Sequence, residues 1–414
     1  MDKEKIIIVG AGLSTTSFLS SLSKMTERQL DITIVDAYEK MGKGAFCYND
    51  STLMNTPSEV LGICSQSSYD FINWYEREYL TSAPKFVSRF IFGKYISFVF
   101  NLSIDTLKKK GCDIRIKHGY MQGFGAKYVK VNDVRLYFNR LILARGAKYN
   151  NFDTLDIIEM ISCQGREIYN IKGAGLTAVD ATLELLRAQP NVKVNLYSRS
   201  GKLPQVKTND LSPIKAKYFT ESNFERSNTY TLRSMYRLAR KEFARHNLIA
   251  KDIIFGNEII EPQSEFEESV YKACKGDTFF NIILGMMLPL ASMWKYLPKN
   301  ELSLYHEKFH RYIHYIHGAM PLIRAIPLLD YINDGKVSVY KINEQDYITY
   351  DIDCSGHRKI TNSSLYYSPE TCRLEGFDNI YGIGMEIRYS NPFMNNIERI
   401  VEISEYLAGE IVEK

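Results

Sequence analysis

The sequence predicts an α/β protein with two Rossmann-like domains, an antiparallel β insert and a helical insert. The main observation is a repeated device, because an apolar strand, a glycine turn and an amphipathic helix occur around Gly10-Ala11-Gly12 and again around Gly173-Ala174-Gly175. Short strands of alternating pattern lie between the two copies. A strand, a helix and a second strand in succession are typical of parallel sheets covered by helices.

The first copy of the device begins with residues 5–9, a run of apolar β-formers that ends at Gly10. A helical pattern of apolar residues follows from Leu13 to Leu22. Residues 31–36 then predict a second strand, which ends in an acidic residue. This order of elements is that of a βαβ unit.

The residues of this first turn suit the binding of a dinucleotide. Gly10 permits the tight bend, and Gly12 lets the backbone approach a pyrophosphate that the N–H groups at the start of the helix stabilise. Asp36 ends the second strand, where a carboxylate accepts hydrogen bonds from a ribose. Thr15 replaces the third glycine of the pattern, and we expect Ser14 to lie near the pyrophosphate. An ordinary turn is the alternative, but it does not account for the second copy.

The second copy has the same order of elements, with a strand at 168–171, the glycine turn, a helix at 177–186 and a strand at 192–197. We expect Gly173, Gly175 and Thr177 to bind a second dinucleotide. No acid ends the second strand, and Arg199 stands there between two serines. A guanidinium and two hydroxyls suit a 2′-phosphate, which favours NADPH over NADH. The alternative, in which Arg199 is a solvated surface residue, stays open.

The remaining segments predict the inserts and the domain boundaries. Residues 127–131 and 134–138 flank Asn132-Asp133, which is a hairpin signal, and residues 229–331 have a mostly helical pattern. Strands return at 337–340 and 347–353, and residues 395–412 predict a closing amphipathic helix. We therefore expect a first dinucleotide-binding domain made of residues 1–160 and 336–414, and a second at 161–335 with the helical insert at about 229–331.

Composition and charge exclude several classes of protein. The chain has 414 residues, 45% of them hydrophobic and 24% charged, as in a globular protein of two or three domains. A net charge of only +4, with scattered basic residues, gives no basis for nucleic-acid binding. The seven cysteines are odd in number and contain no C-x-x-C pair, which indicates neither a disulfide framework nor a dithiol centre and favours a reducing cytoplasm.

Neither the N-terminus nor the strongly apolar segment at residues 279–294 predicts a membrane protein. The N-terminus leads into a short apolar strand and does not have the pattern of a signal peptide. Residues 279–294 are strongly apolar, but polar and helix-breaking residues interrupt them, and they fall short of the roughly 20 residues of a spanning helix. We expect this segment to be a buried or pocket-lining helix.

Two glycine turns separated by an antiparallel insert resemble the flavoproteins with two dinucleotide-binding domains. Within that class the chain resembles the bacterial FAD/NAD(P)-binding proteins related to flavin monooxygenases, which include amine N-hydroxylases. The matching stretches are Gly42-Lys43-Gly44-Ala45-Phe46, Leu53 to Pro57, Arg89 to Tyr95, Gly175 to Asp180, Trp294 to Pro298, Asp353 to Gly356 and Ile380 to Gly384. The resemblance implies two Rossmann-like dinucleotide-binding domains, the first for FAD and the second for NADPH.

The resemblance also implies roles for residues outside the glycine turns. It places Asn55 in a segment that contacts the flavin, and Gly382 and Gly384 at a strand end that closes over FAD. Two positions depart from the family pattern. Arg145 stands where the family usually has Thr, and the last turn lacks the acidic residue that many flavoproteins place against the ribityl chain. We interpret Asn55 and Arg145 as the catalytic candidates close to the isoalloxazine ring.

The resemblance implies an NADPH-dependent flavin oxidoreductase, with a monooxygenase favoured. Reduced flavin would react with O₂ to give a peroxyflavin, which would hydroxylate a small nucleophilic substrate such as an amine. Two alternatives stay open. One is a flavin dehydrogenase or oxidase that inserts no oxygen, and the other is a non-catalytic, FAD-binding redox sensor.

A row of histidines in the helical insert is a further candidate site. His306, His310, His314 and His317 have spacings that put them on one helical face. An inert polar face, contact with substrate through His310 and His314, and a metal site are the three interpretations. We expect no metal, because no cysteine ligand and no H-E-x-x-H motif accompany the row.

Overall fold

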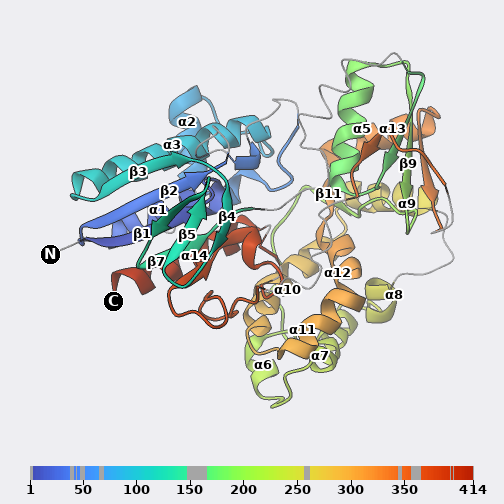
Figure 1. Ribbon diagram of the computed structural model, residues 1–414. Coiled ribbons are helices and arrows are strands. Elements are labelled where there is room, and N and C mark those ends of the chain that lie inside the picture. The colour runs from blue at the N-terminus through green and yellow to red at the C-terminus, as the bar shows by residue number, and fades with distance from the viewer. Residues whose placement is uncertain are drawn as a thin grey trace. The chain divides into compact units, whose positions relative to one another are not determined.

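In the computed structural model the chain forms two compact units, Met1–Ala147 with Ile360–Lys414, and Lys148–Lys359 (Figure 1). We call them unit 1 and unit 2 and treat each by itself. The structure describes residues 3–37, 42, 44–46, 52–64, 70–146, 166–255, 262–343, 347–355, 365–391, 393–394 and 396–413.

The centre of unit 1 is a parallel sheet with the strand order β14-β7-β1-β2-β3. Its strands are β1 (Glu4–Val9), β2 (Leu30–Asp36), β3 (Asp113–His118), β7 (Arg140–Leu143) and β14 (Ile380–Gly382). The apolar run in β1 predicts its central place, since Ile6 and Ile8 are fully buried between neighbours on both sides. The C-terminal segment adds β14, so this unit is built from both ends of the chain, as expected.

Helix α1 (Leu13–Met25) follows the first glycine turn and packs against α3 (Arg89–Lys109) and α14 (Ile397–Val412). The shorter helix α2 (Asp70–Tyr79) also contacts α3. Gly93 lets α3 approach the short 3-10 helix η1 (Gly44–Phe46), since a Cβ at this position would lie 1.9 Å from the Phe46 carbonyl oxygen. The glycine in this helix entry therefore has a packing role.

A three-stranded antiparallel sheet of unit 1 confirms the predicted hairpin. Its strands are β4 (Met121–Phe124), β5 (Tyr128–Val131) and β6 (Val134–Tyr137). Asn132 and Asp133 join β5 to β6 with φ angles of 45° and 67°, which asparagine and aspartate tolerate better than most residues. Val129 and Val131 are fully buried in the same core as β1.

Unit 2 contains a second parallel sheet, with the strand order β12-β9-β8-β13. Its strands are β8 (Ile168–Lys172), β9 (Lys193–Ser198), β12 (Val337–Lys341) and β13 (Ile352–Asp353). The sequence predicts that residues 336–414 belong to the first dinucleotide-binding domain. The boundary lies later along the chain, because β12 pairs with β9 and β13 pairs with β8.

Two helices, α5 (Leu176–Ala188) and α13 (Leu322–Asn333), lie beside β9 in this unit (Figure 1). They are joined by a buried ion pair, in which Asp180 Oδ1 and Arg324 Nη1 are 2.5 Å apart. Both side chains are almost fully buried. Removing one partner of such a pair is costly because it leaves an uncompensated charge in a place from which water is excluded.

The helical insert of unit 2 confirms the mostly helical pattern of residues 229–331. Its elements between β9 and β12, besides α13, are β10 (Val206–Lys207), α6 (Glu221–Glu225), α7 (Leu232–Arg245), α8 (Ala250–Phe255), α9 (Pro262–Cys274), α10 (Phe279–Trp294), α11 (Lys299–Leu304), the π-helical turn η3 (Tyr305–Phe309), α12 (His310–His317) and β11 (Met320–Pro321). The apolar α10 buries Phe280, Ile282, Met293 and Trp294, among others.

Among the described residues, one helix is long and apolar enough to cross a membrane. This helix is α3, and half of its apolar window is buried inside the structure. The segments Gln263–Cys274 and Phe279–Trp294 pass the same test only together, and they are bent by 88°. Since α3 packs against α1 and contributes Phe92, Tyr95 and Ile96 to a core, its composition matches that of a buried core helix.

Candidate functional site

The first glycine turn lies at the carboxyl end of β1 and requires Gly10. Its φ angle is 105°, a region that residues with a side chain rarely adopt. A Cβ would lie 2.2 Å from the carbonyl oxygen of Ala144, which follows β7. The Gly10 N–H donates to the Val35 carbonyl at 2.7 Å, so the turn is fastened between two strands of the sheet.

The N-terminus of α1 is open to an anion. Gly12 is the N-cap, no side chain caps the helix, and its first turn contains no acidic residue. By contrast, Ser88 caps α3 and Asn396 caps α14 by accepting backbone N–H bonds at 3.2 and 3.0 Å. A helix N-terminus without a side-chain cap suits a phosphate, which satisfies the N–H groups and the positive end of the dipole. The turn therefore fits the pyrophosphate of a dinucleotide.

Asp36 and Thr15 hold the shape of this turn. Asp36 Oδ2 accepts a hydrogen bond from the Ala11 N–H at 2.6 Å, which fixes the carboxylate at the strand end where a ribose would bind. Thr15, at the position of the missing third glycine, is fully buried, and its hydroxyl donates to the Gly10 carbonyl at 2.6 Å. The departure from the glycine pattern thus adds a hydrogen bond within the turn.

The C-terminal segment meets the first turn at Ser14. Gly384 has a φ angle of 64°, and a Cβ there would lie 2.0 Å from Ser14 Oγ. The Ile383 N–H donates to the Leu143 carbonyl at 3.0 Å, which anchors the segment to the end of β7. Gly382 is closely packed too, since its Cβ would lie 2.5 Å from Ile387 Cγ2. The structure therefore brings Gly10, Gly12, Ser14, Gly382 and Gly384 together at one edge of the sheet.

Arg145 forms a bidentate ion pair that the sequence did not reveal. Its Nε and Nη2 donate to Glu386 at 2.8 and 2.5 Å, and the Tyr367 hydroxyl donates to the same carboxylate at 3.0 Å. Burial by itself lowers the pKa of the Arg145 guanidinium, but the pairing with Glu386 raises this pKa above its usual value. Glu386 lies in the 3-10 helix η4 (Gly384–Ile387), so the last turn does contain a buried acid.

Other segments of the expected FAD site lie on the same unit. The Gly42 N–H donates to the Ala11 carbonyl at 2.8 Å, and a Cβ on Gly44 would approach the Gly12 Cα to 3.1 Å. Asn55 is half-buried, and the preceding residue, Met54, is held by a hydrogen bond from its N–H to the Val87 carbonyl at 2.7 Å. The role of Asn55 at the flavin stays a prediction.

The second glycine turn repeats the geometry of the first. Gly173 has a φ angle of 114°, and its Cβ would lie 2.6 Å from the Cys354 carbonyl oxygen. Its N–H donates to the Tyr197 carbonyl at 2.7 Å, as the Gly10 N–H does to Val35. Gly175 is the N-cap of α5, which again has no side-chain cap and no acid in its first turn, and Thr177 is exposed in that turn.

Ser198 occupies in unit 2 the position that Asp36 occupies in unit 1. The Asp36 carbonyl accepts from the Gly119 N–H at 2.9 Å, and the Ser198 carbonyl accepts from the Ile342 N–H at 3.0 Å. Each residue is thus the last of the second strand and is bonded to the chain that leaves the third strand. Arg199 follows Ser198 directly and is exposed. No acid therefore stands at the ribose position of unit 2.

The histidine row lies partly outside the described side chains. The rings of His306 and His310 are 5.6 Å apart, and both contact Tyr305 edge-on. The π-helical turn Tyr305–Phe309 precedes α12, so the row does not follow one continuous α-helix. The side chains of His314 and His317 are outside the described set. Among the described residues, no three His, Cys, Asp or Glu side chains gather as metal ligands would.

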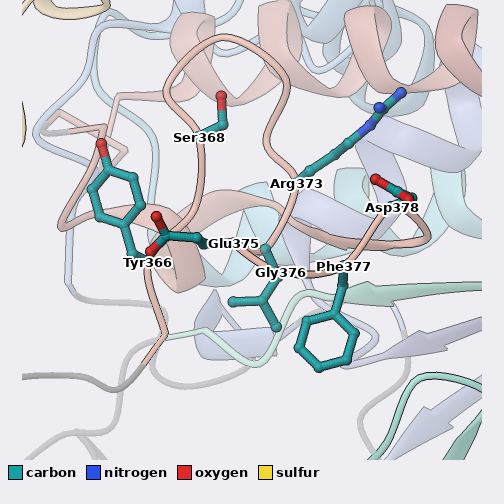
Figure 2. A pocket seen from close by; sticks show the side chains of 8 residues that line it. Tyr366, Ser368, Arg373, Glu375, Gly376, Phe377 and Asp378 are labelled. Atoms are coloured by element: carbon teal, nitrogen blue, oxygen red, sulfur yellow. The ribbon is translucent and has the colours of Figure 1, made fainter.

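A pocket of about 450 Å³ lies on unit 1, between the two legs of a loop that ends in β14 (Figure 2). Phe377 and Asp378 line it shortly before the amino end of β14, whereas both glycine turns lie at carboxyl ends of strands. Its one arginine, Arg373, pairs with Glu410 at 2.7 Å and lies over the Tyr381 ring. This pocket is therefore separate from the nucleotide edge of the sheet.

Comparison with known proteins bears on the first part of unit 1 and on the fold. Residues 7–147 match a protein-family model described as FAD-NAD(P)-binding. No curated protein sequence matches the chain. The fold is shared with solved structures of 10–13% identity.

Three of these structures cover nearly the full length of both chains. The ornithine hydroxylase of Pseudomonas aeruginosa is 13% identical, with 100% of this chain and 99% of that chain covered and a TM-score of 0.53. The FAD-bound cadaverine monooxygenase of Erwinia amylovora is 10% identical, with 100% and 95% covered and a TM-score of 0.56. The ornithine N-hydroxylase of Kutzneria sp. 744, solved with reduced FAD, NADP⁺ and L-ornithine, is 11% identical, with 100% and 99% covered and a TM-score of 0.55.

The family match covers part of the chain, and the structural similarity covers all of it. The match covers β1 to β7 of unit 1 and includes the first glycine turn and Asp36. The shared fold extends over both units. Residues 7–147 are thus an FAD-NAD(P)-binding domain, and the chain as a whole has the fold of a flavoprotein with two dinucleotide-binding domains.

Proposed function

We propose that this protein is an NADPH-dependent FAD monooxygenase that hydroxylates the nitrogen of a small primary amine. The observation that carries the proposal is the pair of glycine turns, which share their backbone geometry and differ at the ribose position. Unit 1 has the carboxylate of Asp36 there, and unit 2 has Ser198 followed by Arg199. Two dinucleotides of different charge are the ligands that such a difference selects.

In this proposal unit 1 holds FAD. The uncapped N–H groups of α1 bind the pyrophosphate, Asp36 accepts hydrogen bonds from the adenosine ribose, and Gly382 and Gly384 keep side chains away from the edge of the sheet. FAD supplies hydride acceptance from NADPH and the activation of O₂. Arg145 keeps its proton because Glu386 stabilises its charge, so it does not act as an acid or base. Since Glu386 also balances that charge, we expect Arg145 to have a positioning role near the flavin.

Unit 2 holds NADPH in the same manner. The N-terminus of α5 binds the pyrophosphate, with Gly173 and Gly175 keeping the approach clear and Thr177 in the first turn. Arg199 stands next to the ribose position, where its guanidinium would pair with the 2′-phosphate. The histidine row of the insert, including His310 and His314, remains our candidate for contact with the amine.

The solved structures of this fold favour N-hydroxylation over other flavin chemistry. Those compared above are named as an ornithine hydroxylase, a cadaverine monooxygenase and an ornithine N-hydroxylase, and all three share the fold over nearly their full length. Thiol–disulfide exchange is disfavoured at three described cysteines. Burial raises the pKa of Cys64 to about 11 and those of Cys354 and Cys372 to about 12, so these side chains stay protonated at neutral pH.

The test is a sequence of three measurements on the purified protein. We expect FAD to be released on denaturation, NADPH to reduce the flavin without oxygen, and amine-dependent O₂ uptake to give one hydroxylamine per NADPH. The amine panel should contain ornithine, lysine and cadaverine. NADPH oxidation that yields only H₂O₂ with every amine would favour an oxidase, and a flavin that NADPH does not reduce would favour a redox sensor.

A further inference from the structure

The two units match residue by residue around their nucleotide edges, which allows positions to be compared between them. Gly10 corresponds to Gly173 and Ala144 to Cys354, because each alanine or cysteine N–H donates to the last residue of the central strand, at 2.8 Å to Val9 and 2.7 Å to Lys172. The third strands correspond as well. In unit 1 Asp36 pairs in register with His118, and in unit 2 Ser198 pairs in register with Lys341.

The register sets the direction of the Lys341 side chain. Paired residues on neighbouring parallel strands direct their side chains to the same face of the sheet. The adjacent pair of β9 and β12 follows this rule, because the Tyr197 and Tyr340 rings stack with centroids 5.1 Å apart. Ser198 and Lys341 are the next pair and therefore share the other face, at the carboxyl edge where α5 begins.

The turn that carries Arg199 packs directly on Lys341. Ser198 Oγ accepts a hydrogen bond from the Gly201 N–H at 3.0 Å, which closes the turn. Gly201 has a φ angle of 69°, and a Cβ there would approach the Lys341 Cβ to 3.0 Å. The side chains of Arg199 and Lys341 thus start from one corner of the sheet, beside the Ser198 hydroxyl.

Both cations at this corner are available to a ligand. Arg199 and Lys341 are exposed, and in the part of the chain that the structure describes no carboxylate pairs with either of them. Two nearby lysines differ from them because each has a carboxylate partner. Lys202 pairs with Glu265 at 2.7 Å, and Lys172 lies 3.7 Å from Asp353. The corresponding corner of unit 1 has a carboxylate, Asp36, and the imidazole of His118. Matching backbone positions therefore hold an acidic side chain in unit 1 and basic side chains in unit 2.

We infer that Lys341 is a second cation for the 2′-phosphate of NADPH and a specificity-determining residue of the second nucleotide site. This inference rests on the proposed function, in which unit 2 binds NADPH. A phosphate dianion between Arg199 and Lys341 accepts charge-assisted hydrogen bonds from both, with the Ser198 hydroxyl in the same corner. FAD carries no 2′-phosphate, which agrees with Asp36 and His118, and neither an arginine nor a lysine, at the two matching positions of unit 1.

The test measures binding to the FAD-loaded protein with two small probes, 2′,5′-ADP and 5′-AMP, by calorimetry. They differ only in the 2′-phosphate, so activity is not needed as a readout. Lys341→Ala should weaken 2′,5′-ADP binding by about 10- to 100-fold, as expected for the loss of a charged hydrogen bond, and should leave 5′-AMP binding unchanged. Lys341→Arg should restore most of the affinity. Lys193→Ala, at the exposed amino end of the same sheet, is the matched control and should change neither affinity.

The outcomes separate this inference from the proposed function. Wild-type protein that binds both probes equally would overturn the assignment of NADPH to unit 2, and the role of Lys341 with it. Wild-type preference for 2′,5′-ADP that survives in Lys341→Ala would overturn only the role of Lys341. Equal weakening of both probes would also overturn it, because the lost contact would then not involve the 2′-phosphate. Circular dichroism of each variant excludes loss of folding as the cause.

Discussion

At the residue scale, the two glycines of the first turn are needed for different reasons. Gly10 has a φ angle of 105°, and a Cβ at this position would lie 2.2 Å from the Ala144 carbonyl oxygen. The protein's own backbone therefore excludes a side chain here. Gly12 has a φ angle of −93°, and among the described residues its Cβ would meet only the Gly44 Cα, at an ordinary 3.5 Å. We therefore expect a side chain at Gly12 to interfere with a bound pyrophosphate and not with the folding of the turn.

This difference gives a prediction for the two alanine variants. Gly10→Ala should lower the melting temperature by several degrees, because a strained residue costs about 1–3 kcal/mol and each kcal/mol shifts a unit of this size by about 2–4 °C. Gly12→Ala should keep the melting temperature of the FAD-free protein but bind FAD more weakly. Thermal unfolding and FAD titration measure the two effects. Equal losses of stability in both variants would contradict the distinction.

At the scale of elements, a buried carboxylate joins α7 to the segment before α6. Glu242 of α7 is 1% exposed, and one of its oxygens accepts hydrogen bonds from the N–H groups of Lys217, Tyr218 and Phe219 at 2.6 to 3.1 Å. Its other oxygen pairs with Arg245 at 2.8 Å. Burial alone would raise the pKa of Glu242, but the three N–H groups and Arg245 lower this pKa below its usual value.

The sign of this shift predicts how the insert responds to acid. A carboxyl group with a lowered pKa in the folded state stabilises the protein above the pKa of the unfolded chain, about 4.3, and this contribution is lost as the pH falls through the lower value. Glu242→Gln should therefore destabilise the protein at pH 7 by about 1–3 kcal/mol, with the difference shrinking below about pH 4. Urea unfolding of the wild-type protein and of Glu242→Gln between pH 7 and pH 3 measures this difference in stability. Glu267→Gln, at an exposed site on α9, is the control and should show no such trend.

At the scale of the whole molecule, the chain is divided into two units, each with its own core and its own glycine turn. One core contains β1, β2 and β7 of unit 1, and another contains β8, β9 and β12 of unit 2. Unit 1 is closed by the C-terminal β14 and α14, so it needs both ends of the chain. Each proposed cofactor binds within one unit and should stabilise that unit alone.

Calorimetric unfolding with each ligand tests this division. A ligand at 100 times its Kd adds about 2.7 kcal/mol to the state it binds, so FAD and NADP⁺ should each raise a different unfolding transition. Gly173→Val should abolish the effect of NADP⁺ and keep that of FAD, because its side chain would clash with the Cys354 carbonyl in unit 2 only. A single transition raised by both ligands would show that the two units unfold as one.

The sequence was informative where neighbouring residues decide the structure. The apolar run before Gly10 predicts a central buried strand, the Asn132-Asp133 pair predicts the hairpin, and both predictions are confirmed. The sequence also predicts that Asp36 ends β2 and that Arg199 follows β9, because each strand comes shortly after its glycine turn and helix. Such features depend on local backbone preference and on hydrophobic periodicity.

By itself, the sequence determined the two glycine turns, the strands and helices beside them, and the different residues at the ends of β2 and β9. Tertiary structure alone decided that β13 pairs with β8, that Glu386 meets Arg145 across 241 residues, and that Lys341 lies in register with Ser198. The physical reason is that turns and periodic elements follow from interactions a few residues apart. Strand order and ion pairs between distant segments depend on how the whole core packs, and no short pattern records that choice.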